Sequence, residues 1–131
     1  MDPPSETALI EVLERFCAGI ADRNPAAVMR VFGPDPDPDL VVVTSEEALL
    51  RGPGELMRFL DRYVEGATTY SWKWDRHAVS KAGLVAWLVA EGTETVVTDG
   101  RLQRHPYRMT MVLKRREDRW VLMQVHGSSP H

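Results

Sequence analysis

The fold is first indicated by residues 84–90, Leu-Val-Ala-Trp-Leu-Val-Ala, a stretch in which every side chain is apolar. A strand that is covered on both faces has such a continuous run, because neither of its sides meets water. This strand is therefore predicted to lie in the middle of a sheet. Apolar and polar side chains alternate with a period of two in residues 70–74 before it and in residues 105–114 after it. With a last strand over residues 120–126, the second half of the chain predicts a long antiparallel meander.

The first half of the chain has helical spacing instead. Apolar side chains recur three, four and seven residues apart in residues 9–20 and again in residues 56–64. Between them, Asn24 followed by Pro25 is a capping residue with proline at the first helical position, which predicts a short second helix. A strand is predicted over residues 40–44. Three helices followed by a meander are typical of an α+β fold with the helices on one face of a curved sheet.

Composition limits the kinds of partner. The chain has 131 residues, with 19 acidic and 16 basic side chains, a formal charge of −3 and one cysteine, Cys17. This is the size of one domain, residues 1–131, without an internal disulfide. No basic cluster is large enough to indicate binding to nucleic acid, and no apolar run approaches the ~20 residues that cross a bilayer. We expect a cytoplasmic protein with neither nucleic acid nor a membrane among its partners.

The most specific motif lies at the end of the chain. Residues 115–130, Arg-Arg-Glu-Asp-Arg-Trp-Val-Leu-Met-Gln-Val-His-Gly-Ser-Ser-Pro, resemble the charged turn, tryptophan and closing His-x-His-x-Ser-x-Pro strand of the SnoaL-like branch of the nuclear transport factor 2-like (NTF2-like) superfamily. Gln124 stands where the first histidine is usual. Residues 24–32 and 50–52 resemble the second helix of that family and its link into the third. The resemblance implies an NTF2-like cone-shaped roll, with three N-terminal helices packed on a curved, mostly antiparallel sheet and a pocket between the two layers.

Catalytic groups known from the superfamily are missing. The tyrosine and the two carboxyl groups of the related ketosteroid isomerases fall near Phe16, Thr44 and residues 109–111, where this chain has none of them. Because an enolate needs both a base and hydrogen-bond donors, that chemistry is not expected here. The histidines and Cys17 lack metal-ligand spacing, so neither a metal nor another cofactor is expected.

The pocket is predicted to be apolar. Helical stripes and strand alternation select its wall, and methionine thioethers suit an adaptable apolar site. The predicted wall consists of Phe16, Phe59, Tyr63, Trp87, Val89, Met109, Met111, Met123 and Val125. We expect this pocket to bind a small, largely apolar or aromatic molecule.

An enzymatic alternative depends on the register of one hairpin. If Asp99-Gly100-Arg101 forms a three-residue loop, Glu91 lies opposite Met109 and faces the pocket. There it would act, with His105, as the general base of a lyase, isomerase or cyclase, and loss of hydration would raise its pKa. A two-residue turn would instead set Glu91 opposite Arg108 in an exposed ion pair. The first register joins the apolar stripes, and it is favoured because it keeps Arg108 and Lys114 out of the cone.

The apolar side chains expected on the outer face of the sheet predict that a second copy of the chain covers it. If Trp87 and Val89 face the pocket, then Ala86, Leu88 and Ala90 face outward and form an unusually apolar patch for a monomer. A homodimer across this face is therefore expected. A non-catalytic dimerisation module is a third candidate function.

Overall fold

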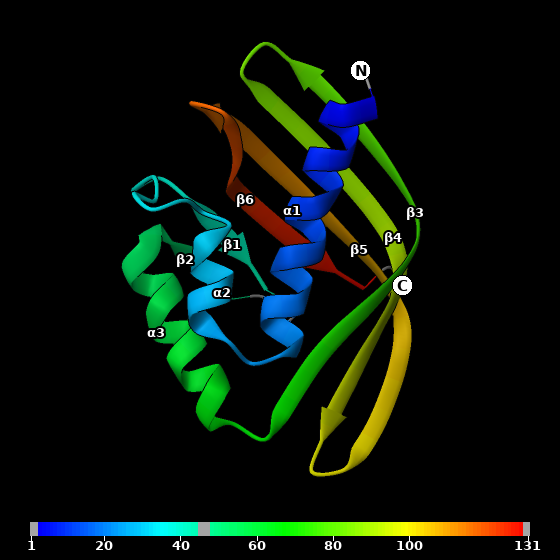
Figure 1. Cartoon of the computed structure of the whole chain (residues 1–131). Coiled ribbons are helices and arrows are strands. Elements are labelled where there is room, and N and C mark those ends of the chain that lie inside the picture. The colour runs from blue at the N-terminus through cyan, green and yellow to red at the C-terminus, as the bar shows by residue number, and fades with distance from the viewer. Residues whose placement is uncertain (1–2, 45–47, 130–131) are drawn as a thin grey trace.

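Three helices cover one face of a curved six-stranded sheet (Figure 1). The computed structural model describes residues 3–44 and 48–129. None of the helices in these ranges is long and apolar enough to cross a membrane. The first helix begins at Pro3, ahead of the apolar stripe that predicted it. The helices are α1 (Pro3–Ala21), α2 (Pro25–Arg30) and α3 (Gly52–Glu65). This arrangement confirms the predicted α+β fold.

The sheet has the order β2-β1-β6-β5-β4-β3, and only the β1–β6 pair is parallel. The predicted meander is present, with strands longer than the alternating segments that indicated them. The short strand β2 was not predicted. The strands are β1 (Val41–Val43), β2 (Leu49–Arg51), β3 (Thr68–Ala82), β4 (Val85–Thr98), β5 (Arg101–Arg116) and β6 (Arg119–Ser128).

A two-residue turn joins β4 to β5. Asp99 and Gly100 have φ angles of 50° and 79°, and Thr98 pairs directly with Arg101. Positive φ at both central residues is the signature of a type I′ turn, whose twist matches that of a hairpin. The favoured three-residue loop is therefore wrong, and the alternative register, with Glu91 opposite Arg108, is the one adopted.

This register reverses the predicted faces of β4. Ala86, Leu88 and Ala90 point toward the helices and belong to the buried core, whereas 47% of Trp87 is exposed on the outer face. Because successive strand residues point to opposite faces, one residue of slip exchanges the inner and outer sets. Residues 84–90 could not show which set of side chains faces inward, since both sets are apolar.

Arg23 connects the helical layer to the sheet. Its guanidinium donates hydrogen bonds to the carbonyl oxygens of Tyr63, Val64, Gly66 and Thr68, and also to the hydroxyl of Thr69. It also lies 5.1 Å from the centre of the Tyr63 ring. One side chain thus joins the end of α1 to the end of α3 and the start of β3.

Tyr63 extends this connection. Its hydroxyl donates a hydrogen bond to the Ile20 carbonyl oxygen at 2.9 Å and accepts one from the Tyr70 backbone N–H at 3.0 Å. Burial raises the pKa of Tyr63, which keeps the phenol protonated as the bond to Ile20 requires. The Tyr63 ring is therefore fixed between α1 and β3.

We predict that Arg23→Met lowers the free energy of unfolding by about 2–3 kcal/mol, because charge-assisted hydrogen bonds to several carbonyl groups are lost at once. Urea denaturation measures the change. Arg15→Met is the matched control on the same helix, since Arg15 forms only an exposed pair with Glu11 and its loss should cost less than about 0.5 kcal/mol. Equal effects of the two substitutions would contradict the role assigned to Arg23.

Candidate functional site

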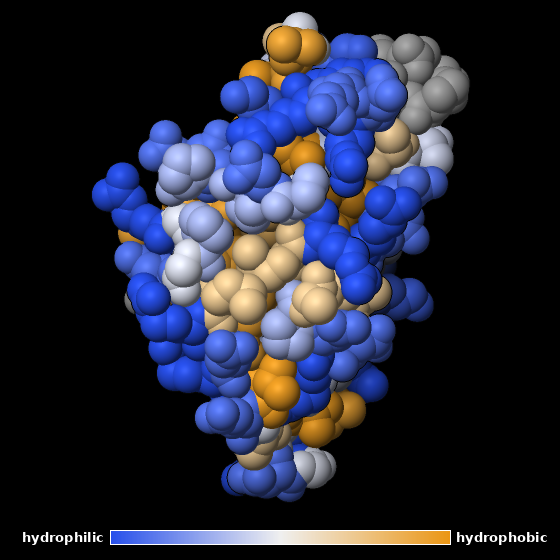
Figure 2. Space-filling view, turned by 60° about the vertical axis from the view of Figure 1, so that its left-hand side comes forward, coloured by the Kyte–Doolittle hydropathy of each residue, from blue (hydrophilic) through white to orange (hydrophobic). Residues whose placement is uncertain are grey.

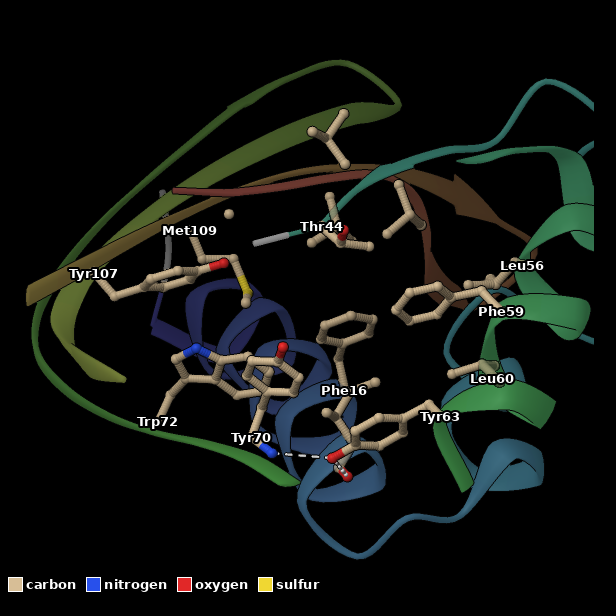
Figure 3. A pocket seen from close by; sticks show the side chains of 15 residues that line it. Phe16, Thr44, Leu56, Phe59, Leu60, Tyr63, Tyr70, Trp72, Tyr107 and Met109 are labelled. Atoms are coloured by element: carbon tan, nitrogen blue, oxygen red, sulfur yellow. Dashed lines mark hydrogen bonds between the residues drawn. The ribbon is translucent and has the colours of Figure 1, made fainter. Parts of the chain in front are cut away.

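A cavity lies between α1, α3 and the concave face of the sheet (Figure 3). About 60 Å³ of it is open to the centre of a water-sized sphere, which is room for several water molecules. Its lining is almost entirely apolar. Six aromatic residues dominate, namely Phe16, Phe59, Tyr63, Tyr70, Trp72 and Tyr107, and the remainder are Ile20, Val42, Val43, Thr44, Leu56, Leu60, Met109, Val125 and Gly127.

Each element contributes rings for a simple geometric reason. Phe59 and Tyr63 are four residues apart on α3 and so share the face that the helix turns toward the sheet. Trp72 of β3 and Tyr107 of β5 face each other across the strand β4 that separates them, with ring centres 6.1 Å apart. At Gly127 on β6, a Cβ atom would collide with the Tyr107 hydroxyl. Glycine at that position therefore makes room for the Tyr107 ring.

Five of the nine residues selected for the pocket wall line the cavity: Phe16, Phe59, Tyr63, Met109 and Val125. The other four do not. The opposite parity of β4 accounts for Trp87 and Val89 and the bulge of β6 for Met123, whereas Met111 shares the concave face of β5 with Met109 but packs into the core outside the cavity. Trp87 and Val89 lie on the outer face, Met111 is buried in the core, and Met123 lies in the bulge.

Among the wall residues that were missed, three lie at positions that the alternation in the sequence already shows. Tyr70, Trp72 and Tyr107 all occur at the alternate positions of their strands and line the cavity. Phe16, Thr44 and Met109 also line the cavity. Pro130, the last residue of the C-terminal motif, lies outside the described residues.

Glu91 does not face the cavity. Its carboxylate accepts hydrogen bonds of 2.6 Å from the Nε atoms of both Arg76 and Arg108 on the outer face. The bond from Arg76, followed by the bond from Arg108, lowers the pKa of Glu91 below its ordinary value. The predicted raised pKa is therefore wrong, and the geometry gives Glu91 no access to a molecule in the cavity.

A different carboxylate is buried beside the cavity. Glu94, three residues further along β4, is only 1% exposed. Its Oε2 accepts a hydrogen bond of 2.9 Å from Nε1 of Trp72, and its Oε1 lies 2.7 Å from Nε2 of His105. The two-residue turn places Glu94 directly opposite His105. Counting pairs outward from Asp99-Gly100 could therefore have found this contact from the sequence.

No metal centre is formed by the described part of the chain. Residues 3–44 and 48–129 contain no group of three or more histidine, cysteine, aspartate or glutamate side chains able to hold an ion. Within that part, the polar groups at or beside the cavity include the hydroxyls of Thr44 and of the tyrosines and the neighbouring Glu94–His105 pair.

A second depression lies on the helical side of the molecule. It is larger, about 1140 Å³, and lies between α1, α2 and the β5–β6 turn. Apolar residues such as Met29 and Met57 alternate there with charged ones such as Arg15 and Asp118. Figure 2 shows moderately hydrophobic side chains bordered by hydrophilic ones on the side that holds α2 and α3. Its mixed, open character makes the aromatic cavity the stronger candidate for a small-molecule site.

Comparison with known proteins identifies the family. Residues 9–131 match the model of the SnoaL-like domain, whereas no curated protein sequence matches. The fold is similar to that of a proposed dehydratase of the NTF2-like family from Streptomyces avermitilis, with a TM-score of 0.83, 16% identity and 99% of each chain covered. It is also similar to a proposed aromatic ring hydroxylase from Novosphingobium aromaticivorans, with a TM-score of 0.84, 17% identity and coverage of 100% of this chain and 93% of that one.

A third structure with this fold is named as an association domain and not as an enzyme. It is a proposed calcium/calmodulin-dependent protein kinase II association domain from Xanthomonas campestris, with a TM-score of 0.75, 16% identity and coverage of 93% of this chain and 85% of that one. At such low identity the three similarities establish the fold alone.

We predict that Arg76→Gln raises the pKa of Glu91 toward its ordinary value, because the ionised carboxylate loses its hydrogen bond from Arg76 and the charge beside it. Carbon-13 NMR of the carboxyl group follows the titration. The folded-state pKa lies below the unfolded one, so ionised Glu91 stabilises the fold above the ordinary pKa, and this contribution disappears as the pH falls through the folded value. Arg101→Gln, at the start of the same strand as Arg108, is the control and should leave the titration unchanged.

Proposed function

This chain belongs to the SnoaL-like domain family of the NTF2-like superfamily, and from that premise we propose that it binds a small, largely apolar aromatic molecule in the cavity between α3 and the sheet. The observation that carries the proposal is the set of six aromatic residues around one space. Aromatic walls favour aromatic ligands, because rings gain from edge-to-face and offset contacts in addition to their burial.

The dimensions of the cavity favour a single ring. Its volume is small, and Phe59 and Met109 point into it from opposite layers (Figure 3). Their side chains have rotatable bonds, so modest rotations admit a substituted benzene, whereas larger ring systems would require the layers to separate. The side chains of Thr44 and of the tyrosines add hydroxyl groups to a largely apolar wall.

We do not propose a catalytic role for Glu91. The enzymatic alternative required its carboxylate to face the ligand, and that carboxylate is instead held by Arg76 and Arg108 on the outer face. The structural relatives named as a dehydratase and a hydroxylase share the fold, and their names alone assign no reaction to this chain.

We predict that p-xylene, a methyl-substituted single ring, binds the native chain and binds Phe59→Ala about tenfold more weakly, since the ring loses one aromatic wall. Ligand-observed NMR competition measures both affinities. Met57→Ala is the matched control on the same helix, because Met57 is exposed and does not line the cavity. If p-xylene does not bind, or if Phe59→Ala and Met57→Ala bind it equally, the cavity is not the ligand site.

We also propose that two copies of the chain associate through the outer face of the sheet. This is the dimer expected from the sequence, formed by the opposite set of β4 residues. Val85 and Trp87 are 41% and 47% exposed there, beside Val89 and with Val112 opposite Trp87 on β5. A half-exposed tryptophan among valines on the outer face of the sheet is the kind of surface that a second copy covers.

Light scattering of the native chain is expected to give about twice its mass of 14.8 kDa. Trp87→Lys should give the monomer mass at micromolar concentration, because a charge would be buried without a partner at the centre of the interface. Leu49→Lys, at an exposed position on the edge strand β2, is the control and should remain dimeric. A native chain that is monomeric at micromolar concentration would refute this interface.

A further inference from the structure

We propose that Glu94 and His105 form a recognition site for one hydroxyl group on the aromatic ligand, so that the preferred ligands are phenol-like molecules rather than hydrocarbons. This inference rests on the proposed function, since it assumes that a ring occupies the cavity. The cavity wall binds the aromatic ring, and the Glu94–His105 pair binds the hydroxyl group attached to that ring.

The Glu94 carboxylate is built into a fixed position. Burying a charged carboxylate is costly unless it is paired and hydrogen-bonded, and each Glu94 oxygen has a partner at close range. Trp72 Nε1 donates to Oε2, and His105 Nε2 lies beside Oε1. A core position with no role beyond packing is filled at lower cost by an apolar side chain, so a satisfied buried carboxylate indicates a demand for polar chemistry at this point.

The carboxylate determines how His105 presents its ring. An ionised Glu94 has only acceptor oxygens, so Nε2 of His105 must carry the proton in the 2.7 Å bond. In the neutral imidazole, Nδ1 is then the nitrogen with a free lone pair. The part of the chain described by the structure supplies no hydrogen bond to Nδ1, and 35% of the His105 side chain is exposed. Glu94 therefore orients an acceptor that a ligand can reach.

This acceptor lies next to the cavity. His105, Tyr107 and Met109 occupy alternate positions of β5 and so share its concave face. Tyr107 and Met109 line the cavity, and the His105 ring centre is 6.3 Å from that of Tyr107. On the neighbouring strands, Trp72 both lines the cavity and bonds to Glu94. A substituent that extends from the ring past Tyr107 and Trp72 reaches His105 next.

The charge at this position selects the chemistry of the substituent. A lone pair on Nδ1 accepts a hydrogen bond and so favours a donor such as a hydroxyl. A carboxylate or phosphate on the ligand would instead meet the lone pair and the negative charge of Glu94 behind it. A neutral hydroxyl also enters the apolar cavity at much lower cost than a charged ammonium group. A phenolic hydroxyl satisfies all three conditions.

The test compares p-cresol with p-xylene, which differ by one hydroxyl in place of a methyl group. The measured quantity is the ratio of their affinities, because a general disturbance of the cavity changes both ligands alike. We expect His105→Phe to reduce the preference for p-cresol about tenfold while leaving p-xylene binding nearly unchanged. Glu94→Gln should reduce it in the same direction, since the amide no longer fixes the tautomer. His126→Phe and Glu91→Gln, which alter a histidine and a glutamate on the outer face, are the matched controls and should keep the native ratio.

Nitrogen-15 NMR of the native chain gives a second readout that needs no variant. Neutral His105 should carry its proton on Nε2, and Nδ1 should show a perturbed shift with p-cresol but not with p-xylene. A proton on Nδ1, or an unchanged affinity ratio in His105→Phe with p-xylene still bound, would overturn this inference and leave the proposed function standing. Loss of binding of both ligands to the native chain would instead overturn the proposed function and the inference with it.

Discussion

The two-residue turn at Asp99-Gly100 is the constraint on which the candidate site depends. Its positive φ angles pair Thr98 with Arg101, and every later pair of the β4–β5 ladder follows from that one. The ladder brings Glu94 to His105, sets Glu91 beside Arg108 and leaves Trp87 on the outer face. A loop longer by one residue would exchange the two faces of β4, so Glu94 would turn outward, away from the cavity, and Ala86, Leu88 and Ala90 would replace Trp87 on the outer face.

Glu91 and Glu94 carry the same carboxylate group but lie in very different environments on the two faces of one strand. They are three residues apart, an odd spacing, so they lie on opposite faces of β4. Glu91 is stabilised as an anion by two arginines at the surface, where water would solvate it in any case. Glu94 is almost completely shielded from solvent, and its carboxylate is instead stabilised by the hydrogen bond from Trp72 and the contact with His105. Only the buried carboxylate fixes the geometry of its partners, because only there would a lost bond leave an unsatisfied charge.

Local patterns in the sequence were sufficient to predict the fold and part of the site. Helical spacing places Phe16, Phe59 and Tyr63 on the faces that meet the sheet, and alternation in β5 places Met109 with them. The apolar run in β4 does not show which of its faces points inward, since the side chains on both faces are apolar. Arg23 was also beyond reach, because its partners are backbone carbonyl groups 40 to 45 residues away. No side-chain pattern encodes such contacts.

Two bulges each shift the alternation of their strand by one residue. In β6, Val112 pairs with Gln124 and Leu113 with Leu122, so Met123 is the extra residue and leaves the face of Val125.

In β3, the register shifts between Trp74 and Arg76, so Trp74 stays on the inner face while Arg76 turns outward to Glu91. Gly92 permits this irregularity, since a Cβ atom there would collide with the Lys73 carbonyl oxygen. A strict period of two would have placed Arg76 beside Trp74 on the concave face, where its charge would be poorly solvated. The β3 bulge thus keeps arginine out of the aromatic side of the sheet and supplies Glu91 with its second cation.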